Sequence, residues 1–296
     1  MELTGTKQMY KVGVTALLLS SILTALSQVF YASKVQAVHP FIFTGISFLL
    51  TTLYFQSFTS KAGVSVNWRK SWYPLVKLNA VTAVTFMGYY FALKYVEPAI
   101  VTSLEIGVAP LFMLLQRQEI SRLKWFVSFG TLAACSILIF GVLSGSSGVT
   151  EQISIQTLIG LIASVICGIG AIYCTEYSKV LNKIGWTSSM ILSKRYYVVI
   201  VLSFAVTYDQ IILYFMDNIG WILLVTALGV IAPSYFMQKG VQYTNTFLVM
   251  MLLGFIPVFT FFFQLFDSRL QYSIITLVGV LLLFGMGLLS IKEGES

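Results

Sequence analysis

A single glutamate, Glu105, interrupts an apolar run of this sequence, SLEIGVAPLF, which extends from Ser103 to Phe112. A carboxylate in such a setting can bind an ammonium group, and it can take up a proton when that ligand leaves. Lys194 and Arg195 form a second polar interruption in an otherwise apolar stretch and could bind a carboxylate. Because neighbouring helical residues point about 100° apart, we expect at most one of this pair to face a shared cavity. The alternative, in which both residues anchor the helix at the cytoplasmic interface, stays open.

Other candidates are polar or aromatic residues within apolar segments. Tyr90 and Tyr235 occupy matching places in the two halves of the chain, and aromatic rings can hold cations or stack on a solute. Gln28 could hydrogen-bond a solute or a neighbouring helix. Pro110 and Pro257 each remove a backbone donor and are predicted to bend their helices. Three further aromatic residues are expected near the cavity: Tyr89, Tyr173 and Phe236. His39 is expected at the membrane interface.

The elements that position these residues are predicted to be membrane helices. The 296 residues are 57% hydrophobic and only 10% charged, which excludes an ordinary water-soluble globule. A helix needs roughly 20 apolar residues to cross the hydrocarbon core, and the apolar runs here are continuous rather than alternating. We predict ten transmembrane helices and no soluble domain, at 13–33, 37–57, 74–94, 96–115, 123–143, 156–177, 187–208, 219–238, 243–264 and 273–291.

The net charge of +7 predicts the orientation of these spans. With the N-terminus inside, the inner segments hold 15 of the 18 Lys and Arg residues, and the outer segments hold Lys34, Lys94 and Arg269. Cytoplasmic segments of membrane proteins are enriched in Lys and Arg. We therefore expect an integral protein of a bacterial inner membrane with both termini cytoplasmic. The basic charge then needs no nucleic-acid partner to explain it.

The sequence also repeats itself. Gly107-x-x-Pro110-x-Phe112 recurs as Gly254-x-x-Pro257-x-Phe259, and Tyr90-Phe91-x-x-Lys94 recurs as Tyr235-Phe236-x-x-Lys239, at shifts of 147 and 145 residues. We predict two five-helix repeats, residues 1–150 and 151–296, in one membrane unit. An odd number of helices inverts the second repeat, a construction found in secondary transporters with a central midplane site. Leu252 stands where the first repeat has Glu105, so the acid breaks the symmetry of the two repeats.

These repeated motifs resemble those of the drug/metabolite transporter superfamily. Ala92-Leu93-Lys94-Tyr95, a helix of small residues and Pro110-Leu111-Phe112 are similar to the ten-helix EamA-type transporters, and Gln242-Tyr243 to Gly279 repeats the pattern. The resemblance covers nearly the whole chain and implies the fold more strongly than the substrate. It also implies a basic residue near Lys194 and Arg195. The sequence departs from the family in the turn after the ninth span. Many members have a Gly-Glu pair there, whereas this chain has Gln264-Leu265-Phe266-Asp267. The corresponding turn of the first half does contain an acid, Glu119.

The predicted function is secondary active transport, by alternating access, that exports small polar metabolites such as amino acids. Lys194 or Arg195 would bind the carboxylate of a zwitterion and Glu105 its ammonium, and proton antiport through Glu105 is one coupling mechanism. Two alternatives stay open, which are efflux of hydrophobic or quaternary cations and metabolite uptake on the same scaffold. The sequence has no HExxH, P-loop or GxSxG motif, so we expect no enzyme, cofactor or metal site. The solute, the coupling ion and the choice between monomer and homodimer stay undecided.

Overall fold

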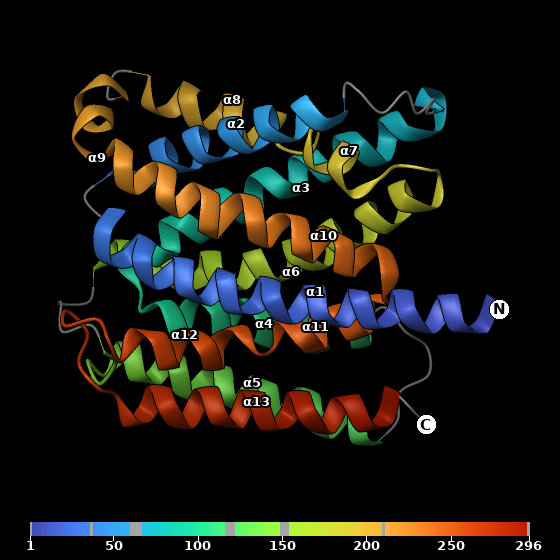
Figure 1. Cartoon of the computed structure of the whole chain (residues 1–296). Coiled ribbons are helices and arrows are strands. Elements are labelled where there is room, and N and C mark those ends of the chain that lie inside the picture. Colours follow the sequence, from blue (N-terminus) through green and yellow to red (C-terminus); the bar gives the residue numbers. More distant parts are fainter. Residues whose placement is uncertain are drawn as a thin grey trace.

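The computed structural model describes residues 2–35, 38–59, 67–115, 122–148, 154–208 and 211–294, and those residues form helices and turns without a strand (Figure 1). The helices of the first half are α1 (Glu2–Phe30), the π-helix η1 (Tyr31–Val35), α2 (Pro40–Thr59), α3 (Trp68–Tyr95), α4 (Pro98–Leu115) and α5 (Arg122–Leu143). Those of the second half are α6 (Ile155–Lys183), α7 (Ser188–Leu192), α8 (Tyr197–Thr207), α9 (Ile211–Thr226), the π-helix η2 (Ala227–Ile231), α10 (Ala232–Tyr243), α11 (Thr246–Leu253), α12 (Ile256–Gln264) and α13 (Ile274–Gly294).

Each of the predicted spans overlaps one or more helices, but among the described residues fewer than ten stretches have the length and composition of a membrane span. In the described part of the chain, six helical stretches are long and apolar enough to cross a membrane: Gln8–Val35, Pro40–Thr59, Trp125–Leu143, Ile155–Lys183, Ser188–Thr207 and Ile219–Tyr243. Two shorter apolar helices are Pro98–Val108 and Ile274–Leu289. The chain therefore has the make-up of an integral membrane protein.

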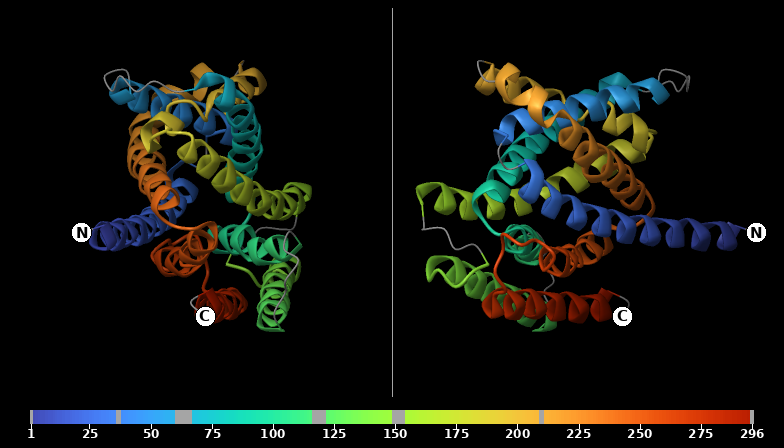
Figure 2. Two further views of the ribbon diagram at one scale, coloured as in Figure 1. Left: turned by 90° about the vertical axis from the view of Figure 1, so that its right-hand side faces the viewer. Right: turned by 60° about the vertical axis from the view of Figure 1, so that its left-hand side comes forward.

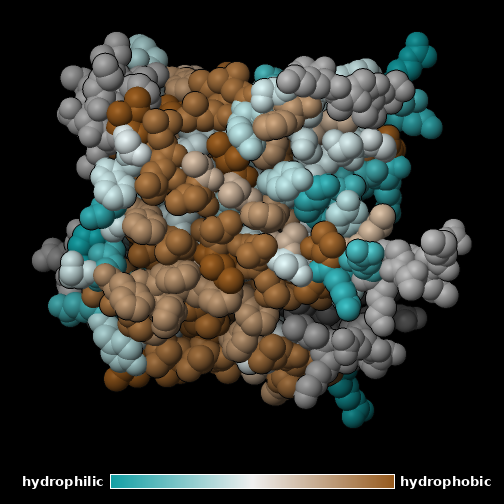
Figure 3. Space-filling model, in the orientation of Figure 1, coloured by the Kyte–Doolittle hydropathy of each residue, from teal (hydrophilic) through white to brown (hydrophobic). Residues whose placement is uncertain are grey.

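The molecular surface agrees with this composition. Figure 3 shows apolar side chains across the middle of one face, with hydrophilic side chains toward its left and right edges. The start of α1 and the end of α13 lie at the same end of the bundle (Figure 1). An even number of membrane crossings would produce this arrangement.

The helices of the two halves pack mainly against each other. The pair α5 and α13 forms one edge of the bundle and the pair α2 and α8 lies at the other, with the remaining helices between them (Figure 2). The contacts also come in matched sets: α1 packs on α10 as α6 packs on α3, and α1 packs on α12 as α6 packs on α4. In the described part of the chain, the two halves thus pack together as one helical bundle.

Local sequence signals explain where several helices begin and end. Ser154 and Thr157 form a capping box at the start of α6, where the Ser154 hydroxyl accepts a hydrogen bond from the Thr157 amide at 3.1 Å. At the end of α6, Gly185 has a φ of 95°. The Trp186 amide donates to the Leu181 carbonyl at 3.1 Å, which is the Schellman arrangement that favours glycine.

Three predicted spans of the second half are not regular helices. The span 187–208 is divided into α7 and α8 by turn residues 193–196, and the span 243–264 is divided into α11 and α12 at residues 254–255. Between α9 and α10 the chain forms the π-helix η2. Pro233 and Pro257 lie in the first turns of α10 and α12, where a missing amide is tolerated, so each proline begins a new helix after an irregular segment.

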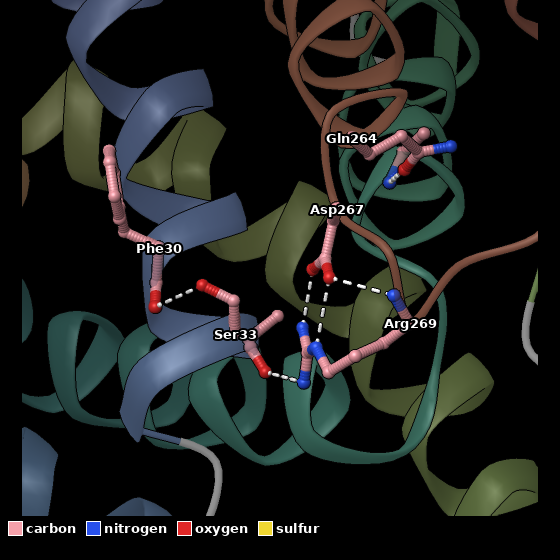
Figure 4. Close-up of polar contacts among 7 residues, drawn as sticks. Phe30, Ser33, Gln264, Asp267 and Arg269 are labelled. Carbon is pink, nitrogen blue, oxygen red and sulfur yellow. Dashed lines mark hydrogen bonds and ion pairs between the residues drawn. The ribbon is translucent and has the colours of Figure 1, made fainter.

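The end of the bundle away from the termini is closed by polar contacts. Figure 4 shows Arg269 beside the Asp267 carboxylate, which is 2.5 Å away. The Arg269 guanidinium also donates to the Ala32 carbonyl of the π-helix η1. Burial alone would raise the pKa of the Asp267 carboxyl. Hydrogen bonds from Arg269 and the positive charges of Arg269 and Lys34 nevertheless hold that pKa below its ordinary value.

Glu97, in the turn between α3 and α4, joins four elements at the same end. Its carboxylate accepts hydrogen bonds from the Gly148 amide at 2.7 Å, from Gln264 Nε2 at 2.6 Å and from the Thr276 hydroxyl at 3.0 Å. Only 1% of its surface is exposed. The side chain thus ties the start of α4 to the segment after α5, to the end of α12 and to the first turn of α13.

We predict that Glu97→Gln lowers the free energy of unfolding by about 1–3 kcal/mol, because an amide NH₂ would face buried donors that lose their acceptor. Glu176→Gln is the matched control, since Glu176 is exposed on α6 and should tolerate the change. Thermal unfolding of the purified protein in detergent measures both variants. Equal melting temperatures would contradict a structural role for the Glu97 contacts.

Candidate ligand-binding cavity

A cavity of about 110 Å³ lies at the centre of the bundle, with room for several water molecules. Both halves of the chain line it, through α1, α3 and α4 and through α6, the 193–196 turn, η2, α10, α11 and α12. The lining residues of the first half are Ser20, Thr24, Ser27, Gln28, Thr85, Phe86, Tyr89, Tyr90, Glu105 and Ile106. Those of the second half are Gly168, Ala171, Cys174, Arg195, Gly229, Val230, Pro233, Ser234, Met237, Met250, Leu253 and Ile256.

Glu105 contributes the acid of the cavity. It lies near the middle of α4, is partly buried, and its carboxylate accepts no hydrogen bond from any residue that the structure describes. Its backbone meets α6 at Gly168, where an added Cβ would lie 2.1 Å from the Glu105 carbonyl oxygen. The two helices can approach this closely only because residue 168 has no side chain.

Arg195 contributes the base. It is 6% exposed and lies in the turn between α7 and α8. One guanidinium nitrogen, Nη2, donates to the Thr82 hydroxyl at 3.3 Å, and the guanidinium carbon lies 5.3 Å from the centre of the Tyr196 ring. Within the described residues, Nε has no hydrogen-bond partner and no carboxylate lies within ion-pair distance of Arg195. The cation is therefore held in place but not neutralised.

Lys194 points away from the cavity. Its ammonium donates to the Tyr197 hydroxyl at 3.0 Å, and the same hydroxyl accepts from Gln56 Nε2 at 2.9 Å. This group of polar side chains is exposed. Of the adjacent pair of basic residues, the structure thus places Arg195 in the lining and Lys194 outside it.

Gln28 and Tyr90 also line the cavity, on α1 and α3. The Gln28 side-chain carbonyl accepts a hydrogen bond from the Thr260 hydroxyl at 2.8 Å, so Gln28 also connects α1 to α12. Tyr90 packs edge-on against Tyr31 and Phe43, with ring centres 5.0 and 4.9 Å apart. Both residues therefore have structural contacts in addition to the surface that they present to the cavity.

Tyr235 does not line the cavity. Its ring stacks on Phe55 at 6.0 Å, because the face of α10 that turns toward the cavity carries Ser234 and Met237 instead. Among the other aromatic candidates, Tyr89 lines the cavity, whereas Tyr173 stacks on Tyr177.

The remaining candidates lie elsewhere. Pro257 begins α12 just after the 254–255 turn, whereas Pro110 lies inside the continuous helix α4 and its side chain is outside the described part of the chain. Glu119 also falls outside the described residues. His39 lies in the turn before α2, where its ring packs against Phe41.

Several residues of this region were not predicted from the sequence. The small polar residues Ser20, Thr24 and Ser234 line the cavity, but serine and threonine are common in membrane helices and carry no distinct signal. Asn79 is a buried polar residue on α3 that hydrogen-bonds the 193–196 turn. An asparagine within a predicted span was a usable signal, as was Glu97 next to Pro98.

The arrangement can bind a small molecule that carries both charges. Among the described residues, the Glu105 carboxylate and the Arg195 guanidinium have no ion-pair partner, and they line one cavity without forming an ion pair with each other. Charged groups away from bulk water are stabilised by a partner of opposite sign. A zwitterion supplies one partner to each.

Comparisons with known proteins bear on the fold alone. No protein-family model matches the sequence, and no curated protein matches it. Chains of solved structures do match. One, described only as a crystal structure of a protein, has a TM-score of 0.65 and 20% sequence identity, over 97% of this chain and 96% of its own.

We predict that Gly168→Ala destabilises the protein by roughly 1–3 kcal/mol, because the new methyl group would collide with the α4 backbone at Glu105 and force α4 and α6 apart. Gly285→Ala on α13 is the control, since a Cβ there meets nothing within 4 Å. Melting temperatures in detergent compare the two. A Gly168→Ala protein as stable as the control would contradict the close crossing of α4 and α6.

Proposed function

We propose that this protein is a secondary active transporter that exports small polar metabolites, foremost amino acids or related zwitterions, by alternating access. The observation that carries the proposal is that Glu105 and Arg195, neither of which has an ion-pair partner among the described residues, line one cavity of an apolar helical bundle. Ionisable residues inside membrane bundles generally mark the path of a substrate or ion. Glu105 would bind the solute ammonium and Arg195 its carboxylate.

The packing of the two halves supports the alternating-access mechanism. The contact of α1 with α10 has its counterpart in that of α6 with α3, which is the pattern expected when two inverted five-helix repeats exchange roles. Broken helices beside a midplane site are a further feature of such transporters. The 193–196 turn and the 254–255 turn contribute Arg195 and the neighbours Leu253 and Ile256 to the cavity.

Membership of the drug/metabolite transporter superfamily, in its EamA-type ten-helix group, is part of the same proposal. It rests on the repeated motifs around Pro110 and Pro257 and on helices at each of the ten predicted spans. Under this proposal both termini are cytoplasmic, and Lys34, Lys94 and Arg269 mark the outer side.

The position of Arg195 weighs against efflux of hydrophobic cations. That function requires the buried guanidinium to face away from the solute, yet Arg195 lines the cavity and has no described carboxylate to neutralise it. A quaternary cation would be repelled by this charge. Uptake and export on one scaffold differ only in the gradient that drives them, so net flux in cells decides the direction.

Proton coupling through Glu105 follows from the same geometry. The carboxylate has no hydrogen-bond donor among the described residues, so it loses its counter-charge when a solute ammonium departs. Taking up a proton at that step restores neutrality before the empty carrier returns. Solute and proton would then alternate on one group, which is antiport.

We predict that Glu105→Gln leaves folding intact but slows net transport in proteoliposomes at least about tenfold, because hydrogen bonds to charged groups contribute about 1.5–3 kcal/mol. Glu176→Gln, which changes an exposed acid on α6, should transport normally. The measurement is uptake of a labelled amino acid driven by an imposed pH gradient. Normal rates at every pH for Glu105→Gln would assign that residue a structural role only.

A competition experiment tests the recognition of both charges. Leucine should inhibit transport at least about tenfold better than leucinamide, which lacks the carboxylate, or 4-methylpentanoate, which lacks the ammonium. Arg195→Gln should remove the preference for leucine over leucinamide, and Lys194→Gln should keep it, since Lys194 points away from the cavity. Inhibition by tetraphenylphosphonium alone would reject the zwitterion proposal in favour of cation efflux.

A further inference from the structure

The turn that carries Arg195 is an interruption of a helix. The segment α7 ends at Leu192, α8 begins at Tyr197, and residues 193–196 form the turn between them. Helix ends leave backbone carbonyls and amides without intrahelical partners, and inside an apolar bundle such groups need partners from elsewhere. The N-cap residue of α8, Tyr196, makes no side-chain capping bond.

Asn79 of α3 supplies these partners on both sides of the turn. Its Nδ2 donates to the Lys194 carbonyl at 2.9 Å, and its Oδ1 accepts from the Val198 amide at 3.4 Å. Nδ2 also donates to the Leu75 carbonyl of its own helix at 3.0 Å, which fixes the orientation of the amide. Asn79 is 5% exposed. It acts as the N-cap of α8 from a different helix.

The two hydrogen bonds between the Asn79 side chain and the turn lie on either side of Arg195 in the sequence. Lys194 precedes it and Val198 lies three residues beyond it, so the backbone is held on both sides of the residue whose side chain lines the cavity. Thr82, one turn along α3 from Asn79, accepts a hydrogen bond from the guanidinium itself. One face of α3 therefore fixes both the backbone and the side-chain end of Arg195.

We infer that Asn79 is a positioning residue for carboxylate recognition: it holds the α7–α8 turn so that the Arg195 side chain stays in the cavity lining, where its guanidinium can bind an anionic group. The inference rests on the proposed function, because the anion is the carboxylate of the transported zwitterion. Thr82 orients the guanidinium in the same subsite. A planar guanidinium binds a carboxylate through paired donors, so a small rotation of this side chain weakens the contact strongly.

The test compares recognition of the carboxylate with overall stability. Asn79→Leu preserves the size of the side chain and removes its hydrogen bonds. In proteoliposomes, this variant should raise the KM for leucine at least about tenfold, and the preference for leucine over leucinamide should fall by the same factor. Thr82→Val, a substitution of similar shape, should lower the preference for leucine over leucinamide in the same way. If Asn79→Leu does not fold, the preference of the Thr82→Val variant tests whether this face of α3 positions Arg195.

The control is Asn67→Leu, which removes a helix cap from the start of the same helix, α3, at a distance from Arg195. It should lose some thermal stability and keep the preference for leucine. If Asn79→Leu and Thr82→Val lower the melting temperature or maximal rate but retain the full preference, Asn79 is structural and the inference is overturned. If the wild type itself does not distinguish leucine from leucinamide, the proposed function fails first.

Discussion

An unpaired charge inside a membrane helix bundle costs several kcal/mol unless protein, water or ligand compensates it, and this constraint governs the centre of the structure. Arg195 is nearly buried and has one hydroxyl, one ring and no described carboxylate beside it. Glu105 lines the same cavity without a described donor. Under the proposed function, the contents of the cavity supply this compensation, and a solute with both charges would satisfy the two groups at once.

The two halves of the chain contribute to this cavity in different ways. The first half supplies the acid from α4, a continuous helix whose position depends on the close approach of Gly168. The second half supplies the base from a helix interruption and adds the π-helix η2 and the 254–255 turn. Irregular segments have fewer backbone bonds to break than continuous helices, so the second half is the more suitable place for conformational change. The matched helix contacts of the two halves thus surround a cavity to which each half contributes a different charged residue.

Much of the scaffold was predictable from the sequence because the length of an apolar run and its helical structure follow from the same bilayer constraint. The helical, membrane-spanning character of the chain follows from that reasoning, and Glu105, singled out as an acid in an apolar run, lines a cavity. The interruption at 193–196 does not, because nothing between Leu192 and Tyr197 is a proline or glycine, and the partner that satisfies the turn, Asn79, is over a hundred residues away. Tyr235 was predicted from its match to Tyr90, but a repeat relates positions along the chain and does not fix which face of α10 meets the cavity.

Access of water to the cavity tests the central claim most directly, and Cys174 provides the probe because its side chain lies in the lining. In a Cys135→Ala, Cys167→Ala background, a small charged thiol reagent applied to membrane vesicles should modify Cys174, and a transported amino acid should slow that reaction. In the converse background that retains only Cys135, which lies outside the lining, the thiol should stay unmodified. Equal reactivity of the two cysteines, or modification of Cys174 that no amino acid slows, would contradict a water-filled cavity in which Glu105 and Arg195 bind the solute.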